Sequence, residues 1–390
     1  MLRISFIVLC LVFSHHAHTQ QFSDSLKISI LTGSSGEDLY TLFGHSAIRV
    51  QDYKFDKDYV FNYGTFDFDT PNFYLKFLRG KLEYVLSIGN TKRLIAAYER
   101  DGRVLTEQKL LIDRTSQQEI VRFLVDNYQP QNRAYKYDFF YDNCATRIRE
   151  ILESELSVKY VGDTTGVRSF RDLLGIYTNQ QSWIDFGIDL LLGIPADKMA
   201  SKAEEMFLPE LLSQNIQTHL VQAQKQPILD SKQQLTKVSN SGKVYQNESF
   251  LNPSFVFLLM FLLIIAMTFA LSPKLMYVVD GVFFTLLGIA GSLLTFMWFG
   301  TDHEATQQNL NIIWLNPLYI FIPLFFTLKE HPLYKRLLWG FLIINVVLLG
   351  CWNILPQALP TASIWIILAA SLRCLDRLGL FNLRGRNALG

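Results

Sequence analysis

Hydrophobic residues are most concentrated in the C-terminal third of the chain. From residue 255 onward, long apolar runs alternate with short polar stretches, at about 255–271, 281–299, 312–328, 337–355 and 361–375. A helix needs about 20 apolar residues to cross the hydrocarbon core of a bilayer. The first four runs approach that length and the fifth is shorter. We therefore expect residues 251–390 to form an all-α membrane domain with five transmembrane helices.

The basic residues between these runs test the number of helices. Lys and Arg follow the first run, the third run and the fifth, whereas the connections 300–311 and 356–361 contain none. Cytoplasmic loops of membrane proteins are enriched in Lys and Arg. Five helices place every basic cluster in the cytoplasm if the first one enters from the exported side. Four helices would leave the basic tail outside, so we reject that number.

A shorter apolar run opens the chain. Arg3 precedes the apolar residues 4–13, and small and polar residues follow around Ala17. This order is typical of a secretory signal peptide, which we assign to residues 1–20. A membrane anchor is the alternative, but the run is only about half the spanning length. Residues 21–250 are then exported.

In residues 21–250 the pattern changes to shorter strand and helix periods. Alternation with β-branched and aromatic residues predicts strands, and helical spacing predicts helices between them. An antiparallel sheet with segregated helices is an α+β layout. A helical extension is expected at about 165–220, followed by a polar tether at 222–249. The predicted strands are 26–31, 47–50, 59–66, 82–88 and 104–112, and the predicted helices before residue 140 are 70–77, 91–98 and 120–128.

Composition adds little about partners. The formal net charge is +1, and no basic stripe with interleaved aromatic residues occurs. Nucleic-acid binding depends on such positive patches, so we expect no nucleic-acid partner.

Cys144 is the residue with the clearest chemical potential. It lies in the first turn of a predicted helix, with Asp142 or Asn143 as the N-cap. A thiol at a helix N-terminus is tuned toward the thiolate. It is also the one cysteine of the exported region, and an unpaired cysteine in an oxidising compartment is either buried or reactive. Cys144 is a candidate nucleophile, and a packed core residue is the alternative.

Histidine is equally sparse in the exported region, which contains His45 and His219. His219 lies among polar residues near the tether, but His45 precedes a predicted strand. A thiol with an imidazole suits nucleophilic acyl transfer. A loop histidine bonded to a backbone carbonyl is the alternative for His45. No second His or Cys lies at ligand spacing, so we expect neither a metal nor a cofactor.

Other polar residues are candidates for supporting roles. Asn62 or Asp67 could orient the imidazole, although ordinary strand-end hydrogen bonding also explains each of them. Donors near the thiol could stabilise an oxyanion together with the Cys144 backbone N–H. Solvated positions are the alternative for the candidate substrate contacts. The candidate oxyanion donors are Tyr141 and Asn143, and the candidate substrate contacts are Arg147, Arg149, Asp302 and His303.

One further segment, residues 183–195, is unusually apolar for an exported surface. We expect it to face the bilayer or to form a wall of an acyl groove. Packing against the sheet is the alternative.

Two short motifs, 44–46 around His45 and 143–144 at Cys144, resemble the permuted papain-like fold of lecithin retinol acyltransferase and NlpC-like enzymes, in which His precedes Cys. The wider set of motifs resembles a family of bacterial envelope proteins that includes lipoprotein N-acyltransferases. Its members carry a periplasmic N-terminal domain on a helical membrane domain. The resemblance implies that His45 and Cys144 form the catalytic pair. The motifs that carry it are 43–49, 62–68, 141–147, 206–209 and 302–303.

The same resemblance implies a reaction. Cys144 would take an acyl group from a membrane phospholipid as a thioester and pass it to the α-amine of the N-terminal diacylglyceryl cysteine of a lipoprotein. The protein would be a multi-pass protein of the bacterial inner membrane with its N-terminal domain in the periplasm. An NlpC-like cysteine peptidase or amidase of the envelope is one alternative. A non-catalytic assembly module with Cys144 in its core is the other.

Overall fold

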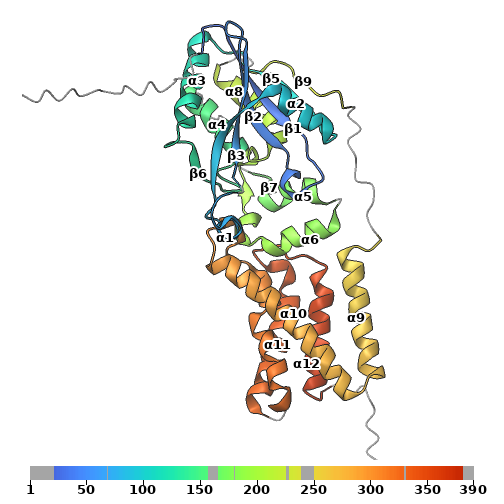
Figure 1. The fold of residues 1–390 in the computed structure, drawn as a ribbon. Coiled ribbons are helices and arrows are strands. Elements are labelled where there is room, and N and C mark those ends of the chain that lie inside the picture. The colour runs from blue at the N-terminus through green and yellow to red at the C-terminus, as the bar shows by residue number, and fades with distance from the viewer. Residues whose placement is uncertain are drawn as a thin grey trace, which may run out of the picture.

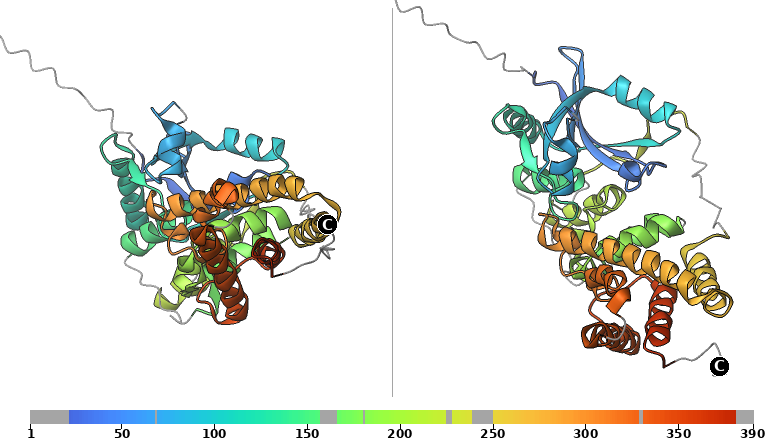
Figure 2. Two further views of the ribbon diagram at one scale, coloured as in Figure 1. Left: turned by 90° about the horizontal axis from the view of Figure 1, so that it is seen from below. Right: turned by 60° about the horizontal axis from the view of Figure 1, so that its bottom comes forward.

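The computed structural model describes residues 22–67, 69–156, 166–179, 181–224, 228–238, 250–328 and 331–380. A sheet covered by helices stands on a bundle of apolar helices, and helix α6 (Ser182–Leu191) lies across the junction (Figure 1). The turned view at the right of Figure 2 again places the green helices between the sheet and the membrane helices. The expected signal peptide, residues 1–20, lies outside the described residues.

A seven-stranded antiparallel sheet forms the centre of the N-terminal region, in the order β6-β4-β3-β2-β1-β5-β9. Side chains alternate across it, so Ile30 and Ile48 face one core while Leu31 and Ala47 face another. Both faces are therefore covered. The strands are β1 (Leu26–Gly33), β2 (His45–Asp52), β3 (Lys57–Thr65), β4 (Glu83–Asn90), β5 (Leu105–Lys109), β6 (Ala134–Lys136) and β9 (Gln233–Gln234).

Helices cover the two faces unequally. The larger core lies under α3 (Arg114–Tyr128), α4 (Cys144–Glu155) and α8 (Pro209–Gln224). The smaller one lies under α2 (Thr91–Arg100), which contributes Leu94, Ile95 and Tyr98. The remaining elements of this region are η1 (Leu39–Thr41), α1 (Phe73–Leu78), β7 (Arg168–Ser169), α5 (Phe170–Thr178), α6, η2 (Ile194–Asp197), β8 (Met199–Ala200) and α7 (Lys202–Glu205).

The middle of the stretch 222–249, which was predicted to be a polar tether, packs on the sheet. Ile228 and Leu229 are buried, and β9 pairs with β5. These two apolar side chains complete the core beside α8, which is why residues 228–238 lie on the sheet edge. Residues 225–227 and 239–249 lie outside the described part of the chain.

The C-terminal region is helical and apolar. Three of its helices are long and apolar enough to cross a membrane: α9 (Pro253–Ala270), α10 (Pro273–Phe299) and α11 (Pro332–Gly350). Helix α12 (Ser363–Arg377) is shorter. The 3₁₀ turns between these helices are η3 (Glu304–Thr306), η4 (Leu310–Ile313), η5 (Pro317–Phe321), η6 (Pro323–Leu328) and η7 (Trp352–Ile354).

The continuous helix predicted at 312–328 is wrong. The segment is a series of 3₁₀ turns, and its residues 317–326 are bent by 50° relative to the preceding residues 304–313. Pro317 and Pro323 each open a turn, because proline lacks the N–H and clashes with the preceding turn of an α-helix. Gly291 on α10 lies so near Leu315 that an added Cβ would be 1.8 Å from its carbonyl oxygen. Close backbone packing against α10 thus replaces regular helical structure.

A buried ionic cluster joins three membrane helices. The Arg373 guanidinium donates to both carboxylate oxygens of Asp280, at 2.6 and 3.0 Å, and to Thr268 Oγ1 at 2.7 Å. Its side chain and that of Asp280 are both fully buried. Asp376 accepts a further bond at 2.8 Å. These contacts connect α9, α10 and α12 near the ends of the helices remote from the sheet (Figure 1).

Polar contacts also join the two halves of the molecule. The Asn309 side-chain amide donates to the carbonyl oxygens of Leu190 and Leu191, at 2.8 and 3.0 Å. Gln357 Nε2 donates to the carbonyl oxygen of Leu192 at 2.9 Å. Asn309 and Gln357 are almost completely buried. The C-terminal end of α6 is therefore fixed to the outer connections of the membrane bundle.

Candidate active site

Cys144 is the first residue of α4, and the residue before it caps the helix. Asn143 Oδ1 accepts from the N–H groups of Ala145 and Thr146, at 2.8 and 3.0 Å. Thr146 Oγ1 accepts in turn from the Asn143 N–H at 2.8 Å, which completes a capping box. Of the two caps considered from the sequence, Asn143 is the one that forms. Buried Ile148 and other apolar side chains hold the helix against the sheet, so the thiol has a fixed place.

His45 is the first residue of β2, where it lies opposite Gly33 of β1. The residue before it, Gly44, has φ +77°, and a Cβ there would be 2.7 Å from the Gly33 carbonyl oxygen. Only glycine fits this conformation and this close approach. The turn before β2 therefore places the His45 imidazole beside the N-terminus of α4.

The imidazole lies between the thiol and an amide. His45 Nε2 is 3.3 Å from Asn62 Oδ1, which leaves Nδ1 as the ring nitrogen available to Cys144. The Asn62 amide is oriented by a bond from its Nδ2 to the Val60 carbonyl oxygen at 3.4 Å. Asn62 and His45 are therefore in contact, and the orienting role of Asn62 stays a prediction.

The electrostatics of this trio favour a charged pair. Burial alone would raise the pKa of the Cys144 thiol, but the charge and hydrogen bond of His45 lower it below the ordinary value, with help from the backbone N–H groups of Ser46 and Cys144. Burial alone would lower the pKa of His45, but interaction with Cys144 and the Asn62 bond raise it. Both shifts favour thiolate with imidazolium.

Tyrosines surround the other side of the thiol. A Cβ on Gly64, which has φ +84°, would lie 3.9 Å from Cys144 Cβ, 3.9 Å from the Tyr135 hydroxyl and 3.8 Å from the Tyr137 ring. The Tyr135 hydroxyl is buried with no hydrogen-bond partner among the described residues. Tyr137 stacks on Tyr84 with ring centroids 4.5 Å apart. Sequence reasoning missed Tyr135 and Tyr137, although their two-residue spacing before Cys144 signals a shared face.

Other candidates from the sequence have structural partners away from the thiol. Asp67 is exposed and accepts from the Asp69 N–H at 2.9 Å, within its own loop. The Tyr141 ring packs edge-on against Phe170, with centroids 5.6 Å apart. The Asn143 amide donates to the carbonyl oxygens of Phe139 and Phe207, at 2.8 and 3.0 Å. Its donors are already used, so Asn143 positions Cys144 by capping α4.

The two arginines of α4 hold neighbouring elements. Arg147 forms a two-pronged ion pair with Asp142, and its guanidinium lies 4.3 Å from the centre of the Tyr135 ring. Arg149 donates to the Ala203 carbonyl oxygen at 2.7 Å. These contacts hold the segment before Cys144 and helix α7 of the helical extension in place.

The outer loop with Asp302 and His303 contacts α1. The Asp302 N–H donates to the Arg79 carbonyl oxygen at 2.9 Å, and His303 Nε2 lies 3.1 Å from the Phe77 carbonyl oxygen. The Asp302 side chain is exposed. This loop fixes the N-terminal region on the membrane domain.

The apolar segment 183–195 lies between the membrane domain and the buried cluster around Phe170, which Ile188 and Leu192 join, rather than on the seven-stranded sheet. Its contact with the bilayer or with an acyl chain stays a prediction. Its rings of Trp183 and Phe186 pack edge-on against Phe257 of α9, with centroids 5.7 and 5.2 Å apart. Apolar side chains of α6 are thus used at the junction.

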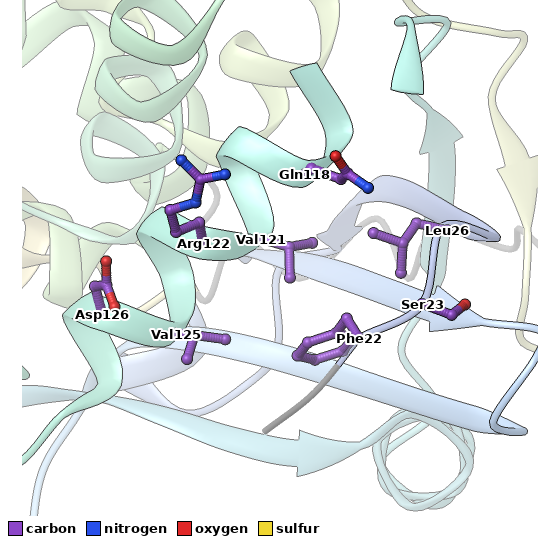
Figure 3. Close-up of a pocket in the computed structure, with 8 residues that line it drawn as sticks. All are labelled: Phe22, Ser23, Leu26, Gln118, Val121, Arg122, Val125 and Asp126. Carbon is purple, nitrogen blue, oxygen red and sulfur yellow. The ribbon is translucent and has the colours of Figure 1, made fainter. Parts of the chain in front are cut away.

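Two other kinds of site were considered. No group of three or more potential metal ligands occurs within the described ranges. A surface hollow of ≈ 370 Å³ lies between the start of β1 and α3, and its lining residues include Phe22, Leu26 and Val121 but neither Cys144 nor His45 (Figure 3). The thiol and imidazole at the end of the sheet therefore remain the candidate active site.

Fold and site together define a membrane protein whose sheet-containing N-terminal domain holds a thiol, an imidazole and an amide in contact. Residues 14–173 match the Lnb N-terminal periplasmic domain, and residues 245–381 match the Lnb transmembrane domain. The chain belongs to the Lnb family of lipoprotein-processing membrane proteins, with a periplasmic N-terminal domain and a C-terminal membrane domain. No curated protein and no solved structure matches it.

Proposed function

We propose that this protein is a lipoprotein N-acyltransferase that uses Cys144 as its nucleophile and a membrane phospholipid as its acyl donor. The observation that carries the proposal is the contact of Cys144 with His45 at the N-terminus of α4, in a chain whose two halves match one lipoprotein-processing family. The partners are phospholipid as donor and diacylglyceryl lipoprotein as acceptor, and no cofactor is required.

In the first half-reaction the Cys144 thiolate attacks the carbonyl carbon of an acyl ester. The backbone N–H of Cys144 at the helix N-terminus and the Tyr135 hydroxyl are suited to stabilise the oxyanion. As the C–O bond breaks, imidazolium His45 gives its proton to the leaving lysophospholipid oxygen. The products are a Cys144 thioester and a lysophospholipid.

In the second half-reaction the α-amine of the lipoprotein cysteine attacks the thioester. Neutral His45 takes a proton from the amine as the C–N bond forms, and the thiolate leaves. Asn62 keeps Nδ1 of His45 toward the sulfur in both steps through its contact with Nε2. The amide product and the thiolate–imidazolium pair result.

The architecture supports a lipid substrate over a soluble peptide. A cell-wall peptidase does not need its catalytic domain fixed to a membrane bundle, whereas here Asn309 and Gln357 fasten the helical extension to that bundle through buried bonds. We further propose a permuted papain-like N-terminal domain, because the strand that begins at His45 precedes the helix that begins at Cys144 and packs with it in one core.

For the membrane arrangement we propose residues 1–20 as a signal peptide and five crossings of the bacterial inner membrane. Two short segments complete the five: the bent pair of 3₁₀ pieces and α12, beside the three long helices. Five crossings also leave the basic C-terminal tail in the cytoplasm.

The test compares lipoprotein N-termini in cells that make the native protein, the Cys144→Ala variant or no protein. Mass spectrometry of the N-terminal peptides is expected to find N-acylated cysteine with the native protein alone. Cys351→Ala is the matched control, because that thiol lies in the membrane domain. This variant is expected to acylate lipoproteins like the native protein. N-acylation that persists in the Cys144→Ala cells would refute the proposal, and changed cell-wall peptides with unchanged lipoproteins would favour a peptidase.

A further inference from the structure

Helix α1 lies on the part of the N-terminal domain beside the membrane helices (Figure 1). Four of its large apolar side chains are exposed. The exposed fractions are 81% for Tyr74, 54% for Leu75, 50% for Phe77 and 40% for Leu78. Contiguous exposed apolar surface marks an interaction site. We call these four residues the α1 cluster.

Contacts with the membrane domain fix the position of the α1 cluster relative to the bilayer. Hydrogen bonds join the loop after α10 to the backbone of Phe77 and Arg79, as described above. Gly80, with φ +66°, lets the two backbones approach, since a Cβ there would be 3.2 Å from the Asp302 backbone. The α1 cluster is therefore held beside the end of a membrane helix.

The composition and length of α10 place its C-terminal end at the level of the lipid headgroups. The rings of Trp298 and Phe299 stack with centroids 4.6 Å apart at the last turn of α10. Aromatic residues concentrate at membrane–water interfaces. With 27 residues, α10 is also longer than the roughly 20 that span the hydrocarbon core, so its end reaches the headgroups.

The charge next to the α1 cluster suits phospholipid. Between Phe73 and Leu82 the chain contains Lys76, Arg79 and Lys81 and no acidic residue. Basic residues near a membrane surface are attracted to lipid phosphates and to anionic headgroups. Apolar and basic side chains side by side are the composition of interfacial membrane helices.

A row of aromatic rings leads from α1 toward the thiol. Each ring contacts the next, and the last one, Tyr137, lies beside Cys144 at the position of Gly64. The centroid distances are 6.2 Å for Phe77–Phe73, 5.6 Å for Phe73–Phe66, 5.3 Å for Phe66–Tyr84 and 4.5 Å for Tyr84–Tyr137.

We propose that α1 inserts into the outer face of the bilayer and is the entry point for the acyl donor. The α1 cluster lies among the upper acyl chains, Lys76, Arg79 and Lys81 hold phosphate, and the aromatic row guides the acyl ester to Cys144. The identity of the donor rests on the proposed function. The contact of α1 with the bilayer does not, and it can be measured separately.

The first experiment measures that contact in the full-length protein in vesicles of phosphatidylethanolamine and phosphatidylglycerol. Trifluoromethyl-phenylalanine replaces Phe77 in one sample and Phe55, an exposed ring in the β2–β3 turn, in the other. Fluorine relaxation is expected to be enhanced by a lipid-borne nitroxide at 77 and by a water-borne gadolinium chelate at 55. Equal behaviour of the two positions would overturn the proposal.

The second experiment compares Tyr74→Glu/Leu75→Glu with the control Tyr53→Glu/Phe55→Glu, in which two similarly exposed residues of the β2–β3 turn are changed. Formation of acyl-enzyme from vesicle phospholipid is expected to fall about tenfold in the α1 variant and to stay at the native rate in the control. Acylation by a water-soluble short-chain ester is expected to be equal in both, which also checks folding. Equal rates from phospholipid would overturn the proposal. If the native protein forms no acyl-enzyme at all, the proposed function fails, while the fluorine experiment still decides the bilayer contact.

Discussion

Replacing His45 by alanine is expected to raise the pKa of the Cys144 thiol above its ordinary value. In the native protein, burial raises that pKa and the interaction with His45 outweighs it. Without the imidazole, only backbone N–H groups oppose burial. An unperturbed thiol has a pKa of about 8.5, so about 3% of it is thiolate at pH 7, and burial reduces that fraction further.

The measurement is the rate of alkylation of Cys144 by iodoacetamide between about pH 5 and pH 10, in full-length protein in lipid nanodiscs. Mass spectrometry of the Cys144 peptide separates it from Cys351 and Cys374. The midpoint of the pH profile is the decisive quantity, because a thiolate of higher pKa is also more nucleophilic and partly offsets the lower thiolate fraction. We expect a midpoint below the ordinary thiol value in the native protein and above it in His45→Ala.

The expected direction of the change follows from the pKa shifts of both Cys144 and His45. The native thiolate is lost as pH falls through its lowered pKa, and the imidazolium is lost as pH rises through its raised pKa. Asn62→Ala, which removes one influence that raises the His45 pKa, should move the thiol midpoint in the same direction by less. His331→Asn is the control, since His331 caps α11 in the membrane domain. A midpoint that is equal in the native and His45→Ala proteins would refute the electrostatic argument.

Three further changes test the scaffold. Asn143→Ala removes a helix cap, worth about 0.5–2 kcal/mol, and two hydrogen bonds to buried carbonyl oxygens, worth about 1–3 kcal/mol each. Amide hydrogen exchange in α4 should therefore be much faster in this variant. The increase should be smaller in Asn143→Asp, which keeps the cap. Gly193→Ala puts a Cβ 1.8 Å from a backbone oxygen of the outer loop and should increase exchange at the junction, whereas Gly187→Ala on α6 meets nothing within 4 Å and should not. Asp280→Leu leaves Arg373 without its main buried partner and should destabilise the membrane domain by about 3–5 kcal/mol. Adding Arg373→Met should restore much of the lost stability. Equal thermal unfolding midpoints of the single and double variants in detergent would contradict this prediction.

The sequence by itself determined the features that depend on short stretches of chain. The apolar runs and the distribution of basic residues separated a helical membrane region from an exported one, because bilayer thickness acts on the composition of each segment. The cap before Cys144 was limited to Asp142 or Asn143, because capping involves residues only two or three positions apart, and the structure shows that Asn143 forms it. The scarcity of Cys and His in the exported region left Cys144 and His45 as candidates before their distance was known.

Tertiary structure alone decided which polar residues meet. Strand register places His45 of β2 beside Asn62 of β3, whereas Asp67 lies past the end of that strand and bonds within its own loop. The Asn143 amide donates to the carbonyl oxygen of Phe207, which lies in the turn between α7 and α8, 64 residues further along the chain. Such contacts depend on how distant elements pack, and no local periodicity encodes them.

The same limit explains the third apolar run of the membrane domain. Its composition predicted a spanning helix, but prolines break the helical hydrogen bonding and the turns instead fit the glycines of α10. Local hydropathy reports that a segment is apolar, whereas its backbone path is chosen by the neighbours against which it packs. The position of α1 at the end of α10 was likewise invisible in the sequence, because two hydrogen bonds between residues more than 200 positions apart establish it.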